Sequence, residues 1–213
     1  MRLQKRFRTT GATARATTGA TAVGLAALSA LILAAGVAVP TTASAHGPDR
    51  AWRLVDRTPG LVQPHALTVD GSLSTRRAAQ EIRLAQQLYT FWHTGEQRYL
   101  DAAVDPGFRD NTLPAGRPQG PTGPSAASRT FRAAVPDLGC ELADLLITGD
   151  KITARLVFRG HFTGVFNGVR GQGQRVEFNA IDIQHVGAAR ITEDWHLEDN
   201  QTLLAQLGAA TGR

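Results

Sequence analysis

The stretch from Arg190 to Gln201 concentrates chemically active side chains within a short distance along the chain. Trp195 and His196 are adjacent, and four acids surround them: Glu193, Asp194, Glu198 and Asp199. Titratable groups beside a large aromatic side chain are typical of a small-molecule pocket. The edge of an ordinary β-sheet can carry the same residues, so the elements that position them must decide between the two interpretations.

Alternation with a period of two predicts which of these side chains share a face of a strand. On the predicted strand 175–186, Asp182 falls on a half-apolar face with Val176, Phe178, Ala180 and Gln184. An acid in such surroundings is costly to leave unpaired. On the predicted strand 190–198, one face carries Ile191, Trp195 and Leu197, and the other carries Thr192, Asp194, His196 and Glu198. Taken alone, this pattern predicts that Trp195 points inward and His196 outward, with Glu193, Asp194 and Glu198 as solvated acids.

The elements before these strands are predicted to be helical. Ser74 is a suitable N-cap for a helix that ends at Gly95 and carries an apolar stripe at steps of three and four residues: Ala78, Ile82, Ala85, Leu88, Phe91 and Trp92. A short helix over 99–104, a short strand over 108–111 and an irregular loop over 114–124 follow. A third helix begins at Ser125 or Ser128 and ends before Pro136.

From residue 141 the pattern changes to strands. The predicted strands are 142–148, 151–166, 175–186 and 190–198, followed by a helix capped by Asp199 or Asn200. Helices followed by an antiparallel meander indicate an α+β domain, with a curved antiparallel sheet wrapped around the N-terminal helices as an open-ended cone. We assign this domain to residues 75–210, and residues 46–74, with three Pro and three Gly, to a linker or loosely docked arm.

The first 45 residues resemble a secretory leader. Five basic residues and no acid precede residue 46, an apolar run covers roughly 20–39, and Ala43-Ser44-Ala45 provides a cleavage site. We therefore expect a secreted or cell-envelope protein cleaved near Ala45. A membrane anchor is the alternative if the leader stays uncleaved. Five of the 23 basic residues lie in the leader, which leaves 18 against 18 acids, so nothing basic remains to suggest nucleic acid.

Cysteine and histidine positions do not indicate a metal site. The single Cys140 cannot form an internal disulfide, and the six His have no i,i+4 pair and no Cys partner. We expect Cys140 to be a small buried residue at the start of a strand. No metal or cofactor is predicted.

Four segments of the sequence resemble the SnoaL-like polyketide cyclases of the nuclear-transport-factor-2-like superfamily. They are Phe131–Leu138, Gly160–Gly168, Arg175–Phe178 and the stretch from Trp195 to Gly208. The resemblance covers roughly residues 76–208 and implies an α+β cone fold. It also implies an intramolecular aldol condensation without metal or cofactor, and superfamily members often pair through the convex face of the sheet, so a homodimer is expected.

The resemblance also places site residues on this sequence. The family's catalytic Asp, directly after the Trp of the terminal strand, corresponds to His196, and its His on the preceding strand corresponds to Asp182. We therefore expect an Asp182–His196 acid/base dyad with His196 facing the pocket, against the period-two pattern. The expected ligand is a hydrophobic carbonyl compound, contacted by the following residues: Asn111, Trp92, Leu88, Phe158, Phe162, Phe178 and Trp195. The alternative is a non-catalytic protein that binds a small molecule in the same pocket.

Overall fold

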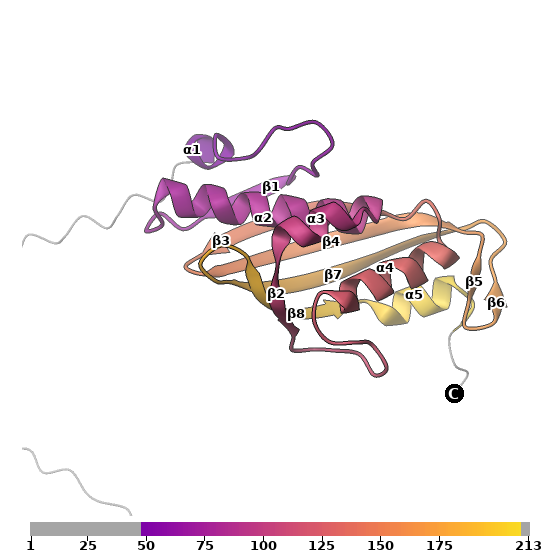
Figure 1. Ribbon diagram of the computed structural model, residues 1–213. Coiled ribbons are helices and arrows are strands. Elements are labelled where there is room, and N and C mark those ends of the chain that lie inside the picture. Colours follow the sequence, from indigo (N-terminus) through magenta and orange to yellow (C-terminus); the bar gives the residue numbers. More distant parts are fainter. Residues whose placement is uncertain (1–47, 210–213) are drawn as a thin grey trace, which may run out of the picture. The chain divides into compact units, whose positions relative to one another are not determined.

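The computed structural model describes residues 48–209, in which helices and a six-stranded sheet form one α+β unit (Figure 1). The predicted leader lies outside the described residues. The helices are α1 (Pro48–Trp52), α2 (Thr75–Thr94), α3 (Gln97–Ala103), α4 (Thr122–Ala134) and α5 (Asn200–Gln206). The strands are β1 (Ala66–Val69), β2 (Val104–Asp110), β3 (Gly139–Thr148), β4 (Lys151–Phe162), β5 (Val165–Phe166), β6 (Val169–Arg170), β7 (Gln174–Val186) and β8 (Ile191–Glu198).

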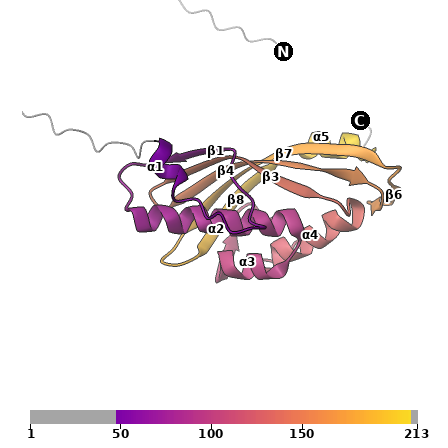
Figure 2. The ribbon, with the colours of Figure 1, turned by 90° about the horizontal axis from the view of Figure 1, so that it is seen from above.

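Helix α2 has the boundaries and the buried stripe that its sequence predicts. The Ser74 hydroxyl accepts a hydrogen bond from the Arg77 amide, and Gly95 ends the helix with φ of 78°. Ala78, Ile82 and Ala85 are fully buried on the face that packs against the sheet. Seen from above, α2, α3 and α4 lie on one side of the curved sheet (Figure 2). We call this side of the sheet the inner face and the opposite side the outer face.

The sheet has the strand order β1-β3-β4-β7-β8-β2. Its four central strands form the antiparallel meander that the sequence predicts. The two edge strands instead run parallel to their neighbours, β1 to β3 and β2 to β8, so the sheet is mixed. The inner residues of β4 and β7 are buried as the period-two pattern predicts, with Ile152, Ala154, Phe162 and Val176 fully enclosed.

Strand β2 matters for function because it joins two distant parts of the chain. Its last residues pair with the middle of β8, with Asp110 opposite Asp194. The Asn111 amide continues this pairing by donating to the Asp194 carbonyl at 2.8 Å. The residues that end β2 therefore lie beside the middle of β8.

The N-terminal segment corrects the expectation of a linker or loosely docked arm. Strand β1 extends the sheet, and Ala51, Val55 and Val69 are buried in the core. The Gln86 side chain also accepts a hydrogen bond from the Asp56 amide at 3.0 Å and donates one to the Asp56 carbonyl at 2.8 Å. The sequence did not reveal this packing, because the few apolar residues of the segment do not recur at the spacing of a helix or a strand.

Two boundaries also differ from the prediction. Helix α4 begins at Thr122, before the expected Ser125, because Gly123 and Pro124 fall in its first turn, where a missing proline N–H is tolerated. The predicted strand 151–166 is split, since β4 stops at Phe162. Gly164 lies so close to α4 that a Cβ there would come within 1.9 Å of the Ala133 carbonyl oxygen.

A β-bulge in β8 decides which way the terminal strand faces. His185 pairs with Glu193 and Val186 with Ile191, so one step on β7 matches two steps on β8 and Thr192 is the extra residue. Ile191 and His196 consequently both face inward although they are five positions apart. His196 is 9% exposed, whereas Trp195 and Leu197 on the outer face are 36% and 74% exposed. The resemblance predicted this orientation, and the period-two pattern did not.

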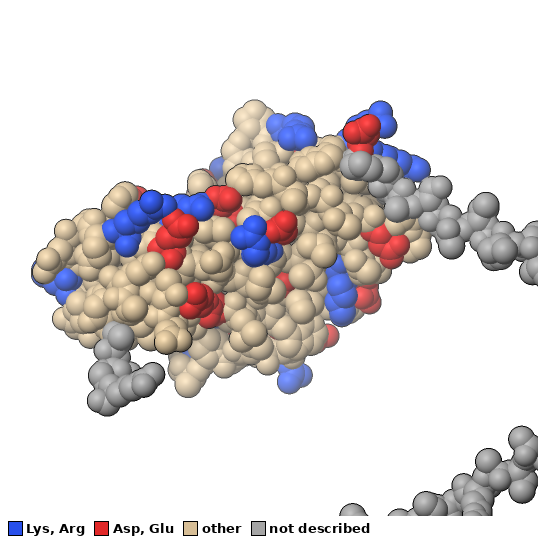
Figure 3. All heavy atoms as spheres, turned by 180° about the vertical axis from the view of Figure 1, so that it is seen from behind, with Lys and Arg blue, Asp and Glu red and all other residues tan. Residues whose placement is uncertain are grey.

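Charges on the described surface are of both signs. On the side seen in Figure 3, acidic and basic side chains lie next to one another, and no large area carries one sign. Ion pairs such as Arg155–Asp144 and Arg159–Glu177 link neighbouring strands across the outer face. Within residues 48–209, no helix combines the length and apolar character needed to cross a bilayer.

Candidate functional site

A cavity lies between the inner face of the sheet and helices α2 and α4. One part of its wall is apolar and the other is polar. Its empty space, including the mouth that opens to solvent, is about 580 Å³. The apolar wall consists of Trp92, Pro124, Phe131, Leu138, Leu156, Phe158, Phe178 and Ala180. The Phe158 and Phe178 rings stack with centroids 5.0 Å apart, which gives this wall a flat aromatic surface.

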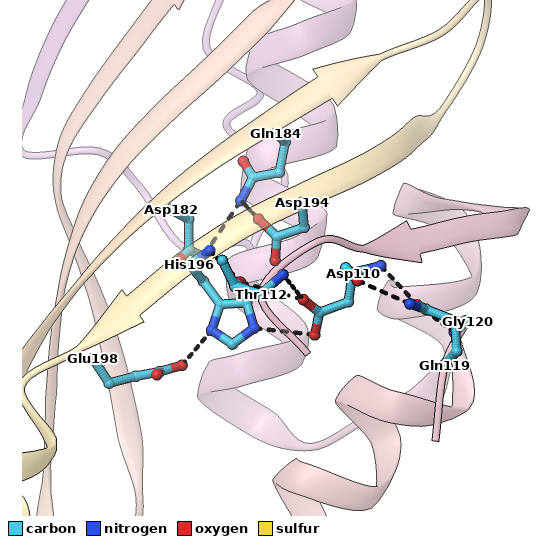
Figure 4. Close-up of polar contacts among 9 residues, drawn as sticks. All are labelled: Asp110, Thr112, Gln119, Gly120, Asp182, Gln184, Asp194, His196 and Glu198. Carbon is cyan, nitrogen blue, oxygen red and sulfur yellow. Dashed lines mark hydrogen bonds and ion pairs between the residues drawn. The ribbon is translucent and has the colours of Figure 1, made fainter. Parts of the chain in front are cut away.

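The polar wall gathers six ionisable side chains from β2, β7, β8 and the loop that follows β2: Asp110, Arg117, Asp182, Asp194, His196 and Glu198. Figure 4 shows that five of them converge on one region, with His196 at the centre. A wall of this composition opposite an aromatic surface suits a ligand with an apolar body and reactive oxygen atoms.

His196 is held by carboxylates on both sides of its ring. Its Nδ1 lies 2.7 Å from Glu198 Oε1, and its Nε2 lies 3.1 Å from Asp110 Oδ2. Burial disfavours the charged ring, but the hydrogen bond and charge of Glu198, together with Asp194 and Asp110, outweigh it and raise the pKa of His196 to about 9. At neutral pH the ring is therefore a cation that donates from both nitrogens.

The backbone of His196 is fixed as well. Its amide donates to the Thr112 hydroxyl at 2.9 Å, and the Thr112 amide donates to Asp110 Oδ1 at 2.9 Å. Glu198 completes the arrangement: burial works against its charge, but the hydrogen bond from His196 and the charges of His196 and Arg117 keep the pKa of Glu198 below its ordinary value. This carboxylate therefore stays ionised beside the imidazolium.

Asp182 and Asp194 share one hydrogen-bond donor. The Gln184 side-chain amide donates to Asp182 Oδ2 at 3.4 Å and to Asp194 Oδ1 at 3.3 Å. The Tyr89 hydroxyl donates to Gln184 Oε1 at 3.0 Å, which fixes the orientation of the amide. Tyr89 and Gln184 are fully buried, so this connection lies beneath the cavity wall.

The pKa values of Asp182 and Asp194 are both raised above those of ordinary aspartates. Burial, followed by the negative charge of Asp194, raises the pKa of Asp182 well above its ordinary value. Burial likewise raises the pKa of Asp194 to about 7, although the charge of His196 works in the opposite direction. Asp182 therefore keeps its proton to a higher pH than an ordinary carboxyl group does, and Asp194 changes its charge near neutrality.

The structure brings five of the nine predicted site residues to the cavity: Asp182, His196, Trp92, Phe158 and Phe178. Asp182 and His196 occupy directly paired positions on β7 and β8 and face the same way. They make no direct hydrogen bond to each other. Asp110 and Glu198 contact the imidazole instead, which corrects the interpretation of Glu198 as a solvated acid.

The other four predicted residues lie away from the cavity. Leu88 and Phe162 are buried in the hydrophobic core. The Asn111 side chain donates to Glu193 Oε2 at 2.9 Å, outside the cavity wall. Trp195 lies on the outer face, where Lys151 Nζ is 5.5 Å from its ring centroid. Residue type alone could not separate core residues from cavity-lining residues, because both positions require large apolar side chains.

Four ionisable residues of the cavity were not predicted as site residues: Asp110, Arg117, Asp194 and Glu198. A signal existed for two of them. Asp194, His196 and Glu198 alternate on one face of β8, so an inward His196 requires that both acids also face inward. Asp110 and Arg117 had no such signal, because their contacts depend on the pairing of β2 with β8.

Other chemistry suggested by residue types is accounted for by burial. Cys140 is buried, as expected, and burial raises the pKa of its thiol well above the ordinary value. Such a thiol is a weak nucleophile. Within residues 48–209, no group of three His, Cys, Asp or Glu side chains is arranged to hold a metal ion. The cavity offers the cation of His196, the Asp182 carboxyl group with its raised pKa, and the Asp194 carboxyl group, which titrates near neutrality.

Several solved structures resemble this chain in both fold and sequence. A crystal structure of a protein from Bacillus cereus ATCC 10987, described as a putative polyketide cyclase, is 44% identical, covers 74% of this chain and 99% of its own, and superposes with a TM-score of 0.67. TsrD from Streptomyces laurentii is 30% identical over 62% of this chain and 96% of its own, with a TM-score of 0.56. IdmH from Streptomyces antibioticus, also described as a putative polyketide cyclase, is 28% identical over 59% of this chain and 96% of its own, with a TM-score of 0.54.

Among proteins with curated functions, none matches this chain. The sequence profile described as SnoaL-like polyketide cyclase matches residues 82–207, which is more than half of the chain and includes most of the cavity. The profile and the neighbours described as polyketide cyclases support a cyclase-type role. The expected family and cone-type fold are thus confirmed, and the chain belongs to the SnoaL-like polyketide cyclase family.

Proposed function

We propose that this protein closes a ring in a hydrophobic carbonyl compound by an intramolecular aldol reaction. The observation that supports this proposal is the pair of displaced carboxyl groups, Asp182 and Asp194, beside a buried imidazolium in an aromatic-walled cavity. Groups whose environments move their pKa values apart are the means by which one site supplies both an acid and a base. The apolar wall holds the body of the substrate and leaves its carbonyl oxygens toward the acids.

The aldol reaction requires a base, and we assign this role to Asp194. Its ionised form removes a proton from the carbon next to a carbonyl group, and the electrons of the broken C–H bond form an enolate. Because its pKa is about 7, Asp194 is both sufficiently ionised at neutral pH and basic enough to accept the proton. His196 has both ring nitrogens occupied by carboxylates, so it is not free to take a proton.

Asp182 and His196 stabilise the charge that develops. Protonated Asp182 donates a hydrogen bond to the carbonyl oxygen that becomes the enolate oxygen, and the fixed positive charge of His196 lowers the energy of the same anion. The enolate carbon then attacks a second carbonyl carbon of the same molecule, which forms the C–C bond. The new alkoxide takes the proton held by Asp194, so no atom is gained or lost and both acids regain their starting states.

The first half of this reaction can be measured without knowing the natural substrate. β-Tetralone, a bicyclic ketone, exchanges its α-protons for deuterium in heavy water, and proton NMR follows the exchange. We expect the protein to accelerate exchange, with a rate that rises through pH 7 as Asp194 ionises and falls above about pH 9 as His196 loses its charge. The Asp194→Asn variant should lose roughly 100-fold or more of the acceleration.

Asp144→Asn is the matched control, since Asp144 pairs with Arg155 on the outer face. It should exchange at the rate of the unmodified protein. Full exchange activity in Asp194→Asn would contradict the assignment of the base. Tight binding of β-tetralone with no exchange at any pH would instead favour a carrier that uses the same cavity.

We also propose that the protein forms a homodimer through the outer face. Two cross-strand pairs, Ile181 with Leu197 and Ile183 with Trp195, place four exposed apolar side chains together. Leu146, which is 42% exposed, lies in the same cross-strand row as Ile183. These five residues form the outer patch. A contiguous apolar patch of this kind is typical of a protein–protein interface.

A further inference from the structure

The loop after β2 places an unpaired cation at the cavity. Arg117 lines the cavity and is half-buried, but its guanidinium has no hydrogen bond and no ion pair within residues 48–209. It affects Glu198 only through its charge. Glu198 already accepts a hydrogen bond from His196 Nδ1 at 2.7 Å, and Asp110 accepts one from the other nitrogen of the same ring. Both of these carboxylates therefore bond to His196, and neither forms a hydrogen bond or ion pair with Arg117.

The loop that carries Arg117 is attached to the site. The Gln119 side chain accepts a hydrogen bond from the Asp110 amide at 2.7 Å and donates to the Asp110 carbonyl at 2.8 Å (Figure 4). The Arg117 amide donates to the Pro114 carbonyl at 3.1 Å, which closes a turn. The position of Arg117 is thus coupled to Asp110, the residue that contacts His196.

The loop that carries Arg117 also packs closely against the start of α4. A Cβ at Gly123 would come within 2.6 Å of the Pro118 carbonyl oxygen, so the loop approaches the helix only because residue 123 is a glycine. A Cβ at that position would lie 3.8 Å from Cγ and Cδ of Arg117. The stem of the Arg117 side chain therefore runs beside the first turn of α4.

An arginine in this position favours an anionic partner. The guanidinium is planar and positively charged, and it matches a carboxylate with two parallel hydrogen bonds. The N-terminal end of α4, a helix of 13 residues, adds partial positive charge on the same side, since Pro124 of its first turn lines the cavity. The opposite wall is aromatic, so the complementary ligand has an aromatic or other apolar body and one carboxylate.

We propose that the ligand of this cavity carries a carboxylate that pairs with Arg117 while its apolar body contacts the aromatic wall. This inference rests on the proposed function, because it describes the substrate class of the same cavity. It assigns Arg117 the role of a specificity-determining residue that selects an acid over the corresponding ester or amide. It assigns no chemical step to Arg117.

A matched pair of probes isolates the charge of the ligand. β-Naphthoate and its methyl ester have the same ring system and differ in the ionised group, and isothermal titration calorimetry gives their affinities without any turnover. The protein should bind the acid roughly tenfold or more tightly than the ester, because a charge-assisted hydrogen bond to the guanidinium is stronger than one between neutral groups. Arg117→Gln should abolish the preference and leave the affinity for the ester unchanged.

Two further variants serve as controls. Arg129 is exposed on α4 and does not line this cavity, so Arg129→Gln should keep the full preference. Arg117→Lys keeps the charge but loses the planar fork, and it should retain part of the preference. Unchanged melting temperatures will show that all variants are folded.

The results separate this inference from the proposed function. Equal affinity of the protein for acid and ester, or a preserved preference in Arg117→Gln, would overturn the inference even if β-tetralone exchange is observed. A preference that requires Arg117 would support it even if exchange is absent. Failure of the protein to bind either probe would count against both.

Discussion

The inner face of β7 and β8 buries acids and a histidine, whereas the outer face of the same two strands exposes large apolar side chains. Asp182 and His196 are 6% and 9% exposed. The residues that follow each of them in the chain, Ile183 and Leu197, lie on the outer face and are 41% and 74% exposed. Soluble proteins usually show the reverse. The two proposals assign the two faces different roles: the buried charges carry out the chemistry, and the exposed apolar surface contacts a second subunit.

The ionisable groups of the inner face depend on one another for hydrogen bonds and for opposite charge. His196 lies between Asp110 and Glu198 and donates a hydrogen bond to each, and Gln184 links Asp182 to Asp194. The outer face needs no such compensation, since each apolar side chain there can be changed without leaving a charge unpaired. Substitutions should therefore cost much more on the inner face.

The largest effect is expected for His196→Ala. Removing one member of a buried charged group costs about 3–5 kcal/mol because the remaining charges lose their partner, here Asp110 and Glu198. Urea denaturation should show this loss, and β-tetralone exchange should fall to the uncatalysed rate. His185→Ala is the control, because His185 bonds Thr192 and Asp150 outside the cavity. A His196→Ala protein with unchanged stability would show that the inner charges do not depend on one another.

The pH dependence of stability should identify the inner groups separately. The pKa of Asp194 is raised from 3.8 to about 7, so the folded state holds a proton that the unfolded state releases, and the free energy of unfolding falls as pH rises through this interval. The pKa of His196 is raised from 6.5 to about 9, so its contribution is complete below pH 6.5 and is lost by about pH 9.

Denaturation curves across this pH range can be compared with those of two variants. Asp194→Asn should flatten the lower interval and His196→Asn the upper one. Identical pH dependence in all three proteins would mean that neither group titrates as its surroundings require.

A smaller effect is expected beneath the cavity wall. Tyr89→Phe removes the donor to Gln184 Oε1 and leaves a fully buried amide oxygen without a partner, which costs about 1–3 kcal/mol. The freed amide should also hold Asp182 and Asp194 less firmly and shift the pH of half-maximal β-tetralone exchange. Tyr99→Phe, whose hydroxyl is contacted by Arg98 at the surface, should change neither quantity.

The smallest effect on the single chain is expected at the outer patch. Leu197→Glu should change the free energy of unfolding of the monomer by less than about 0.5 kcal/mol, because this side chain is already exposed. It should nevertheless weaken self-association roughly tenfold or more in analytical ultracentrifugation, with β-tetralone exchange preserved. Val165→Glu, on the separate two-stranded sheet, is the matched control. A wild-type protein that stays monomeric at all concentrations would contradict the proposed dimer.

The elements that the sequence predicted well are those defined by local patterns. The limits of α2 follow from Ser74 and Gly95, and the inner faces of β4 and β7 follow from strict alternation. The elements that it missed depend on distant partners. Strand β1 exists because the edge of β3 is available to it, and the early start of α4 depends on close packing between Gly123 and Pro118.

The sequence by itself determined the family, the order of the elements and the positions of Asp182 and His196 on adjacent strands. Only the tertiary structure decided what surrounds them. The extra residue at Thr192 reverses the face of β8, which no alternation within that strand reveals, since a bulge is defined by pairing with β7. Asp110 reaches His196 from 86 residues away through the β2–β8 pairing. The ionisation of the site follows from that assembly, because burial and neighbouring charges arise only when the strands come together.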